Sequence, residues 1–150
     1  MSEQTATNAT RADYCAVAIA EAFRGDGERL CNPIGNLPLK LGGSLPNAQL
    51  AYVTYGTLAP NRDNVVLLTH GYTSSHLFAG GDQASEGTWS GLVGPGKAID
   101  TDRFFVVSSN MLGSAYGSTA PRSRNPASGR AYGPDFPDIT LDDIVEAQRR

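Results

Sequence analysis

The stretch with the clearest chemical content is residues 67–76, LLTHGYTSSH. An apolar run that ends in His-Gly and passes into a loop of small residues is one way for a protein to present a backbone N–H to a developing oxyanion. The N–H of Tyr72 is the predicted donor, because Gly71 lets the chain turn sharply and approach a ligand closely. Substrate contacts are predicted for His70, Gly71 and Thr73. An ordinary turn between a strand and a loop explains the segment equally well.

Side chains that ordinarily act as a nucleophile, a general base or a metal ligand are few. His70 and His76 are the only histidines, and no acidic or cysteine partner lies at ligand spacing from them. Structural roles are therefore favoured for both histidines over metal binding or base catalysis, and no metal site is predicted. The serines next to strand ends have no base with an orienting partner, which favours polar structural roles for Ser74, Ser75, Ser108 and Ser109.

Asn110 and the glycine-rich stretch that follows it form a second candidate wall of the site. Asn110 comes after an apolar run, and residues 113–121 leave from it. Two interpretations have equal weight: the side chain of Asn110 lines a substrate pocket, or it caps the strand end by bonding neighbouring backbone. Arg122, Arg124 and Arg130 approach a carboxylate or a phosphate on one interpretation, and are only solvated on the other.

These residues need strands to position them. The apolar runs 65–68 and 104–107 predict strands that lie centrally in a sheet and are covered on both faces. Ahead of them, residues 37–41 and 49–55 predict an antiparallel hairpin with its loop at residues 42–47. The hairpin is expected to lead into a mostly parallel sheet.

Two helices are predicted to flank this sheet. Residues 12–23 have apolar positions at helical spacing, and Thr140 with Asp143 three residues later predicts a capped helix near residue 150. The predicted inward face of the second helix is Leu141, Ile144, Val145 and Gln148. Strands that alternate with helices and long loops indicate an α/β fold, in which ligands bind at the carboxyl ends of parallel strands. His70 and Asn110 both fall at such ends.

Composition excludes several classes of function. The 150 residues carry a formal net charge of −3, with a pI near 5.2, so no basic face is expected and nucleic acid is not an expected partner. No stretch approaches the roughly 18–20 apolar residues of a membrane span, which predicts a cytoplasmic protein without a membrane partner. Two cysteines, Cys15 and Cys31, predict reduced thiols and not a disulfide scaffold.

Six segments in order along the chain resemble one family. They are LAYVTYG (50–56), HGYTSSH (70–76), GPGKAIDTDRFF (94–105), NMLG (110–113), GSTAP (117–121) and YGPDFPDIT (132–140). Together they resemble the N-terminal portion of the homoserine O-acetyltransferase family, and the resemblance is collinear over residues 37–150. It implies the N-terminal part of an α/β-hydrolase fold, incomplete at 150 residues, preceded by an extension over residues 1–36.

The resemblance also implies a reaction. Members transfer an acyl group from acetyl-CoA or succinyl-CoA to a hydroxyl, that of L-homoserine in methionine biosynthesis, by a ping-pong mechanism with a Ser-His-Asp triad. The residue at the place of Tyr72 supplies a backbone N–H to the oxyanion hole. No resident cofactor is implied, the expected partners are the small-molecule substrates, and a homodimer of the complete enzyme is compatible with the resemblance.

Departures from the family pattern affect two expectations, the identity of the acyl acceptor and the activity of this chain alone. Gly71-Tyr72 replaces the commoner Ala-Leu, Ala120 stands where glycine is usual, and the loop of residues 70–76 is one residue shorter. No G-x-S-x-G elbow occurs in the sequence, so the triad is expected beyond residue 150 and this chain alone is expected to be inactive. The alternatives are an esterase of the same superfamily and a non-catalytic remnant or binding module.

Overall fold

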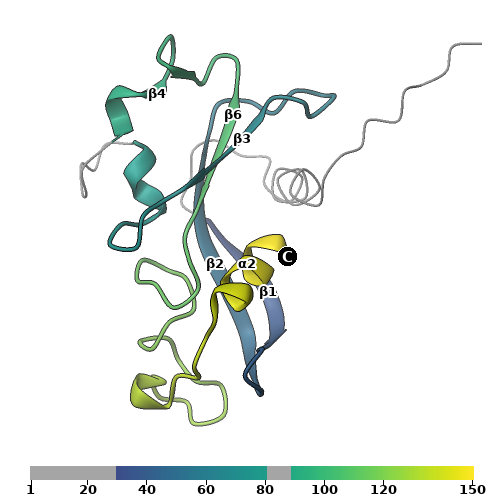
Figure 1. Ribbon diagram of the computed structural model, residues 1–150, viewed down its shortest axis with the longest axis vertical. Coiled ribbons are helices and arrows are strands. Elements are labelled where there is room, and N and C mark those ends of the chain that lie inside the picture. Colours follow the sequence, from purple (N-terminus) through teal and green to yellow (C-terminus); the bar gives the residue numbers. More distant parts are fainter. Residues whose placement is uncertain (1–29, 81–88) are drawn as a thin grey trace, which may run out of the picture.

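The computed structural model describes residues 30–80 and 89–150, so the helix predicted for residues 12–23 lies outside the described residues. The strands are β1 (Leu30–Pro38), β2 (Ser44–Tyr55), β3 (Val65–Thr69), β4 (Val93–Gly94), β5 (Ile99–Asp100) and β6 (Phe105–Ser109). The helices are η1 (His76–Ala79), η2 (Trp89–Gly91), η3 (Gly133–Asp135) and α2 (Leu141–Arg149). The main sheet has the order β1-β2-β6-β3, and β4 pairs with β5 separately (Figure 1).

The predicted hairpin is present, but its strands are longer and its turn lies earlier than predicted. β1 and β2 are antiparallel, and the turn forms where Leu39 N–H donates to Gly43 O and Gly42 N–H donates to Leu39 O. Gly42 and Gly43 have φ of 100° and 75°, which glycine adopts at no steric cost. β1 tolerates Pro33 because the register shifts next to it and the strand lies at the edge of the sheet.

The parallel pair β3/β6 brings the predicted site residues to one edge. Thr69 pairs with Ser109 at the end of the ladder, so His70 and Asn110 both leave from the carboxyl edge, as predicted. The prediction that both strands are covered on both faces is right for β6, whose five residues are all buried, and wrong for β3. Leu67 in β3 is 42 % exposed, and β3 is one of the two edge strands of the described sheet, where only β6 flanks it.

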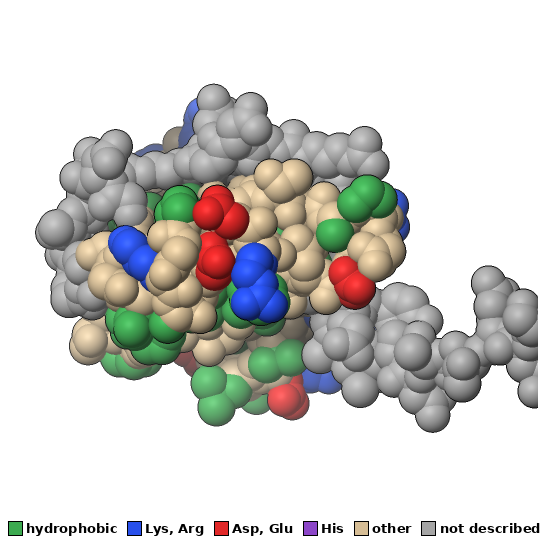
Figure 2. All heavy atoms as spheres, turned by 90° about the horizontal axis from the view of Figure 1, so that it is seen from above, with side chains coloured by type: hydrophobic (Ala, Val, Ile, Leu, Met, Phe, Trp, Pro, Cys, Tyr) green, Lys and Arg blue, Asp and Glu red, His purple; other side chains and the backbone are tan. Residues whose placement is uncertain are grey.

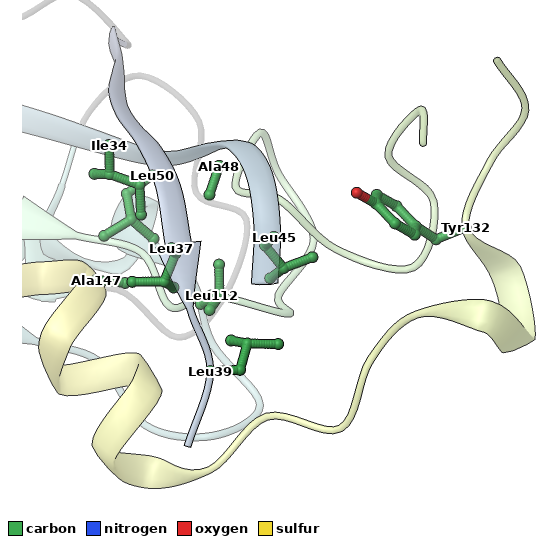
Figure 3. Packing of buried hydrophobic residues seen from close by; sticks show 9 residues of the cluster. All are labelled: Ile34, Leu37, Leu39, Leu45, Ala48, Leu50, Leu112, Tyr132 and Ala147. Carbon is green, nitrogen blue, oxygen red and sulfur yellow. The ribbon is translucent and has the colours of Figure 1, made fainter. Parts of the chain in front are cut away.

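The core consists of clusters that join the sheet to its coverings. The largest lies between the hairpin, the loop after β6 and α2, and contains Ile34, Leu37, Leu39, Leu45, Ala48, Leu50, Leu112, Tyr132 and Ala147. Figure 3 shows Leu37 of β1 and Ala147 of α2 next to each other in this cluster. A second cluster packs β3 and β6 against η1 and β4 through Leu68, Phe78, Ala79, Val93 and Val106. The second cluster anchors the far end of the loop that follows β3.

Helix α2 begins with the predicted capping box. Asp143 N–H donates to Thr140 Oγ1 at 3.3 Å, and Thr140 N–H donates to Asp143 Oδ2 at 2.8 Å. The other carboxylate oxygen of Asp143 accepts from Lys40 N–H at 2.9 Å, a contact that the sequence did not indicate. Asp143 is therefore both the cap of the helix and its link to the turn of the hairpin.

The predicted inward face of α2 is wrong for Leu141 and Val145 only, because Gln148 faces the sheet as predicted and its Nε2 donates to Ser109 Oγ at 3.2 Å. Leu141 is 80 % exposed and Val145 is 62 % exposed, whereas Asp143 and Ala147 are both 1 % exposed. Ile144 packs against the large cluster, as predicted. The helix is turned by its cap, because the hydrogen bonds of Asp143 hold this carboxylate on the buried side. A prediction based on the apolar face of an amphipathic helix places charged residues in solvent, so it gives the wrong rotation of α2 about its own axis.

Replacing Asp143 by alanine is expected to lower the free energy of unfolding by about 2 kcal/mol, because the helix loses its cap and Lys40 N–H loses its acceptor. Although burial alone raises the pKa of this carboxyl, hydrogen bonds from Thr140 and Lys40 hold its pKa below the ordinary 3.8. The pKa of Asp143 is therefore lower in the folded chain than in the unfolded chain. The contribution of the ionised carboxylate to folding stability is complete above the unfolded pKa, and it is lost as pH falls through the folded pKa.

Urea unfolding of both chains at neutral and acidic pH measures this difference. Asp142→Ala is the matched control, because Asp142 is exposed and contributes to the first turn only through the helix dipole, about 0.5 kcal/mol at most. Equal stability of the Asp143→Ala and Asp142→Ala chains at neutral pH would contradict the role assigned to Asp143.

Candidate functional site

The loop after β3 presents free backbone donors at the carboxyl edge of the sheet. Gly71 O accepts from Ser74 N–H at 3.0 Å, which closes a turn directly after His70. Tyr72 stands at its tip with 94 % of its surface exposed. Within the described part of the chain, the N–H groups of Tyr72 and Thr73 have no acceptor. The predicted oxyanion donor is thus available to a ligand.

The orientation of this donor is set by the carbonyl of the same peptide unit. Gly71 O and Tyr72 N–H point in opposite directions from one planar trans peptide. His70 Nδ1 lies 2.8 Å from Gly71 O, and because a carbonyl oxygen only accepts, Nδ1 carries a proton in this contact. His70 and Ser74 N–H together hold Gly71 O, so they direct Tyr72 N–H away from themselves. His70 acts here through the backbone.

The far end of the loop is fixed to the central strand. Ser75 is the N-cap of η1, and its hydroxyl accepts from Leu77 N–H at 3.3 Å. Ser108 of β6 is fully buried, and its hydroxyl donates to His76 O at 2.9 Å. Phe78 packs in the second cluster, with its ring centroid 6.3 Å from that of His70. Ser75 and Ser108 therefore have the structural roles predicted for them.

Asn110 is fully buried and bonds neighbouring backbone. Its N–H donates to Ala51 O at 2.8 Å, and its Nδ2 donates to Ala115 O. These contacts correspond to the strand-end interpretation. Asn110 Oδ1 has no hydrogen-bond donor among the described residues, and His70 Nε2 likewise has no partner there. Two buried polar atoms are thus left at the carboxyl edge.

After Asn110, side-chain hydroxyls of the loop accept hydrogen bonds from the backbone of β2. Ser118 Oγ accepts from Ala51 N–H at 3.1 Å, and Thr119 Oγ1 accepts from Gln49 N–H at 2.9 Å. Thr119 N–H returns a bond to Gln49 O at 2.9 Å. The hydroxyls of Ser118 and Thr119 therefore replace strand β6 as the partner of β2. The sequence does not indicate this role for either residue, since the Gly-Ser-Thr composition predicts only a loop.

The three candidate arginines have different surroundings. Arg124 Nε donates to Gly129 O at 3.0 Å, which closes the turn of its own loop. Arg130 is exposed, with its N–H donating to Ser128 Oγ. Arg122 is exposed as well, and of the three arginines it is the one among the lining residues of a pocket of about 240 Å³. The structure thus separates Arg122 from the two arginines of the neighbouring turn.

No group of three or more His, Cys, Asp or Glu side chains in residues 30–80 and 89–150 is arranged to hold a metal ion. None of the helices in those ranges has the length and apolar character needed to cross a membrane. On the face seen from above, Lys and Arg side chains lie among acidic and neutral ones (Figure 2).

Comparisons with known proteins place this arrangement in context. No protein-family model matches the chain. The homoserine O-succinyltransferase of Methylibium petroleiphilum is 51 % identical over 117 residues, which cover 76 % of this chain and 30 % of that protein. This chain therefore spans about three tenths of the length of the curated relatives it matches.

Solved structures agree in fold. A crystal structure of homoserine O-acetyltransferase from Bacillus anthracis superposes with a TM-score of 0.71 at 33 % identity, over 83 % of this chain and 35 % of that one. A crystal structure of an esterase gives a TM-score of 0.70 at 33 % identity, over 83 % of this chain and 36 % of that one. The chain has the N-terminal part of the α/β-hydrolase fold, as predicted.

Proposed function

We propose that this chain, which corresponds in sequence to the N-terminal portion of the homoserine O-acyltransferases, belongs to an enzyme that transfers an acetyl or succinyl group from coenzyme A to the hydroxyl of L-homoserine. The acyl-CoA and homoserine are substrates, so no resident cofactor is part of the proposal. The reaction takes place in the cytoplasm, where acyl-CoA is available to biosynthetic enzymes.

The observation that carries the proposal is the free N–H of Tyr72 at the carboxyl edge of a parallel strand pair. When a serine attacks a thioester, the carbonyl oxygen becomes an oxyanion, and preorganised N–H donors stabilise it more than they stabilise the ground state. Tyr72 N–H supplies one donor. The second donor is the N–H of the residue after the nucleophile, which lies outside this chain together with the histidine and aspartate of the triad.

The topology supports a route by which the nucleophile reaches this donor. α2 follows β6, and a strand after α2 that joined the sheet in parallel by a right-handed crossover would find its open place next to β3. The carboxyl end of that strand would then adjoin His70 and the loop of Tyr72. A serine on a sharp turn at that end would lie beside the oxyanion donor.

A second candidate function is hydrolysis of the acyl-enzyme by water. It is favoured by the esterase whose structure matches this chain at the same identity and over the same share as the acetyltransferase structure. Both reactions use the same oxyanion hole and the same acyl-enzyme. They differ in whether an alcohol or water accepts the acyl group.

The test is a hybrid in which residues 30–150 replace the matching region of the Methylibium petroleiphilum homoserine O-succinyltransferase. We expect the chain of residues 1–150 alone to release no coenzyme A from succinyl-CoA or acetyl-CoA. We expect the hybrid to release it, at least about tenfold faster with L-homoserine than without, since an acyl-enzyme accumulates when its acceptor is missing. The unmodified relative is the control.

A hybrid that unfolds cooperatively but releases no coenzyme A would overturn the proposed role of this segment. Release at the same rate with and without homoserine would support the hydrolase. Turnover by residues 1–150 alone would overturn the expectation that the nucleophile lies elsewhere.

A further inference from the structure

The pocket beside Arg122 has the dimensions of a site for a small molecule. It lies between the hairpin, η1 and the loop after β6, with Cys31, Ala51, His76, Tyr116, Gly117 and Arg122 among its lining residues. Its volume of about 240 Å³ corresponds to roughly eight waters at liquid density. A short-chain organic acid fits this space, and a whole coenzyme A molecule does not.

Close contacts between the loop after β6 and the hairpin hold the walls of the pocket. Gly117 O accepts from Gln49 Nε2 at 2.9 Å and from Cys31 Sγ at 3.8 Å. A side chain at position 117 would place its Cβ 3.1 Å from Ala51 Cβ and 3.4 Å from Cys31 Sγ. The loop therefore presses directly on the hairpin, so the pocket is shaped before any ligand arrives, which lowers the entropic cost of binding.

One of the three left-handed non-glycine residues in the described part of the chain lies in the pocket wall. Tyr116 has φ of 67°, in the left-handed region that residues other than glycine rarely adopt. Gly117 follows with φ of 109°. A non-glycine residue persists there only when its surroundings impose it, and such residues gather at ligand-binding sites. Tyr116 is one of the residues that line the pocket.

Arg122 supplies the positive charge among the described residues that line the pocket. Arg122 is the only Lys or Arg among the lining residues, and no Asp or Glu lines the pocket. Within residues 30–80 and 89–150, the Arg122 guanidinium makes no ion pair or hydrogen bond. A guanidinium presents paired N–H donors in a plane, which matches the two oxygens of a carboxylate.

We propose that this pocket binds a small organic acid through its carboxylate, with Arg122 as the charged contact and the hairpin and Tyr116 as the walls around its carbon chain. The site is made entirely of described residues and does not rest on the proposed acyl transfer. The carboxylate belongs either to a free acid or to the far end of an acyl group carried by coenzyme A.

Isothermal titration with sodium succinate, at constant ionic strength, tests binding directly. It is made on the chain of residues 1–150 and on the hybrid described above, so binding is measured without any need for turnover. We expect saturable binding that Arg122→Gln weakens at least about tenfold, which corresponds to 1.4 kcal/mol. Arg130→Gln is the matched control, since Arg130 lies in the same loop region outside the pocket, and it is expected to leave binding unchanged.

A second pair of probes separates the two sources of the carboxylate. Tighter binding of succinyl-CoA than of acetyl-CoA to the hybrid, lost in Arg122→Gln, assigns the site to the end of an acyl group. Equal affinity for the two thioesters with retained succinate binding assigns it to a free acid. The proposal is overturned if succinate does not bind, or if Arg122→Gln and Arg130→Gln change its affinity equally. Because turnover of the hybrid is measured separately, failure here is distinct from failure of the proposed function.

Discussion

Replacing Tyr72 by proline is expected to reduce kcat of the hybrid by about 100- to 1,000-fold, the usual loss when one oxyanion donor is removed. Proline has no N–H, so the substitution deletes the donor at the tip of the loop. KM for the acyl-CoA is expected to change far less, because the oxyanion exists only in the transition state and the intermediate. Steady-state kinetics with succinyl-CoA and homoserine measure both constants.

Tyr72→Ala is the matched control for this substitution. It keeps the N–H and removes a side chain that is 94 % exposed, so kcat is expected to stay within about threefold of the parent hybrid. His70 and Ser74 continue to hold Gly71 O, which keeps the peptide unit oriented. Equal losses in the two variants, at unchanged thermal stability, would show that the backbone donor is not what the reaction uses.

Gly56→Ala is expected to lower the free energy of unfolding by about 3–5 kcal/mol. Gly56 follows β2 with φ of +79°, and a Cβ there would lie 2.3 Å from Phe104 O and 2.5 Å from Thr101 O. Both obstacles are backbone, so relief requires the turn before β6 to move away from the end of β2. Because β6 pairs with both β2 and β3, the displacement reaches both of these neighbouring strands. Urea unfolding measures the loss.

Gly43→Ala measures the cost of a left-handed alanine without the steric clash that a Cβ meets at Gly56. Gly43 has nearly the same φ, +75°, but a Cβ there would meet nothing within 4 Å. Its expected cost is therefore only that of a left-handed alanine, about 1–2 kcal/mol. The difference between the two variants is the contribution of close backbone approach at Gly56. If both variants lose the same stability, the contact with Phe104 O and Thr101 O is not a constraint.

The sequence predicted the strands of the sheet better than their positions in it. Both apolar runs, residues 65–68 and 104–107, form strands close to their predicted limits, because continuous apolar side chains favour buried strands. The runs do not differ enough to tell the central β6 from the outermost β3. That distinction depends on which segments pair with each strand, and pairing is a property of the whole fold.

Helix α2 illustrates a different limit. The capping box was predictable because it involves residues three apart in sequence. The rotation of the helix was not, because it depends on the bond between Asp143 and Lys40 N–H, 103 residues apart. Local rules identify where a helix begins, whereas a long-range hydrogen bond decides which side it buries.

For the candidate site, the sequence predicted which edge of the sheet carries it but not the contacts that form it. His70 and Asn110 were predicted to fall at the carboxyl ends of parallel strands, and the register of β3 and β6 places both residues just after one edge of the sheet. The pocket beside Arg122 was not predicted. Its wall includes Tyr116 in the left-handed region, a backbone conformation that tyrosine does not favour and that the sequence therefore does not predict. The sequence offered three equivalent arginines, and only the path of the loop distinguishes them.

The hydroxyls that pair with β2 give part of this sheet an unusual dependence on side-chain identity. Along most of a strand, any residue with an N–H and a carbonyl maintains the ladder, so substitution alters packing but not the bonds themselves. At Gln49 and Ala51 the N–H groups rely on Thr119 Oγ1 and Ser118 Oγ. Main-chain order in the hairpin is therefore encoded some 70 residues away, in a loop. A transplanted loop preserves the end of β2 only if it carries hydroxyls at these two positions, whatever its length elsewhere.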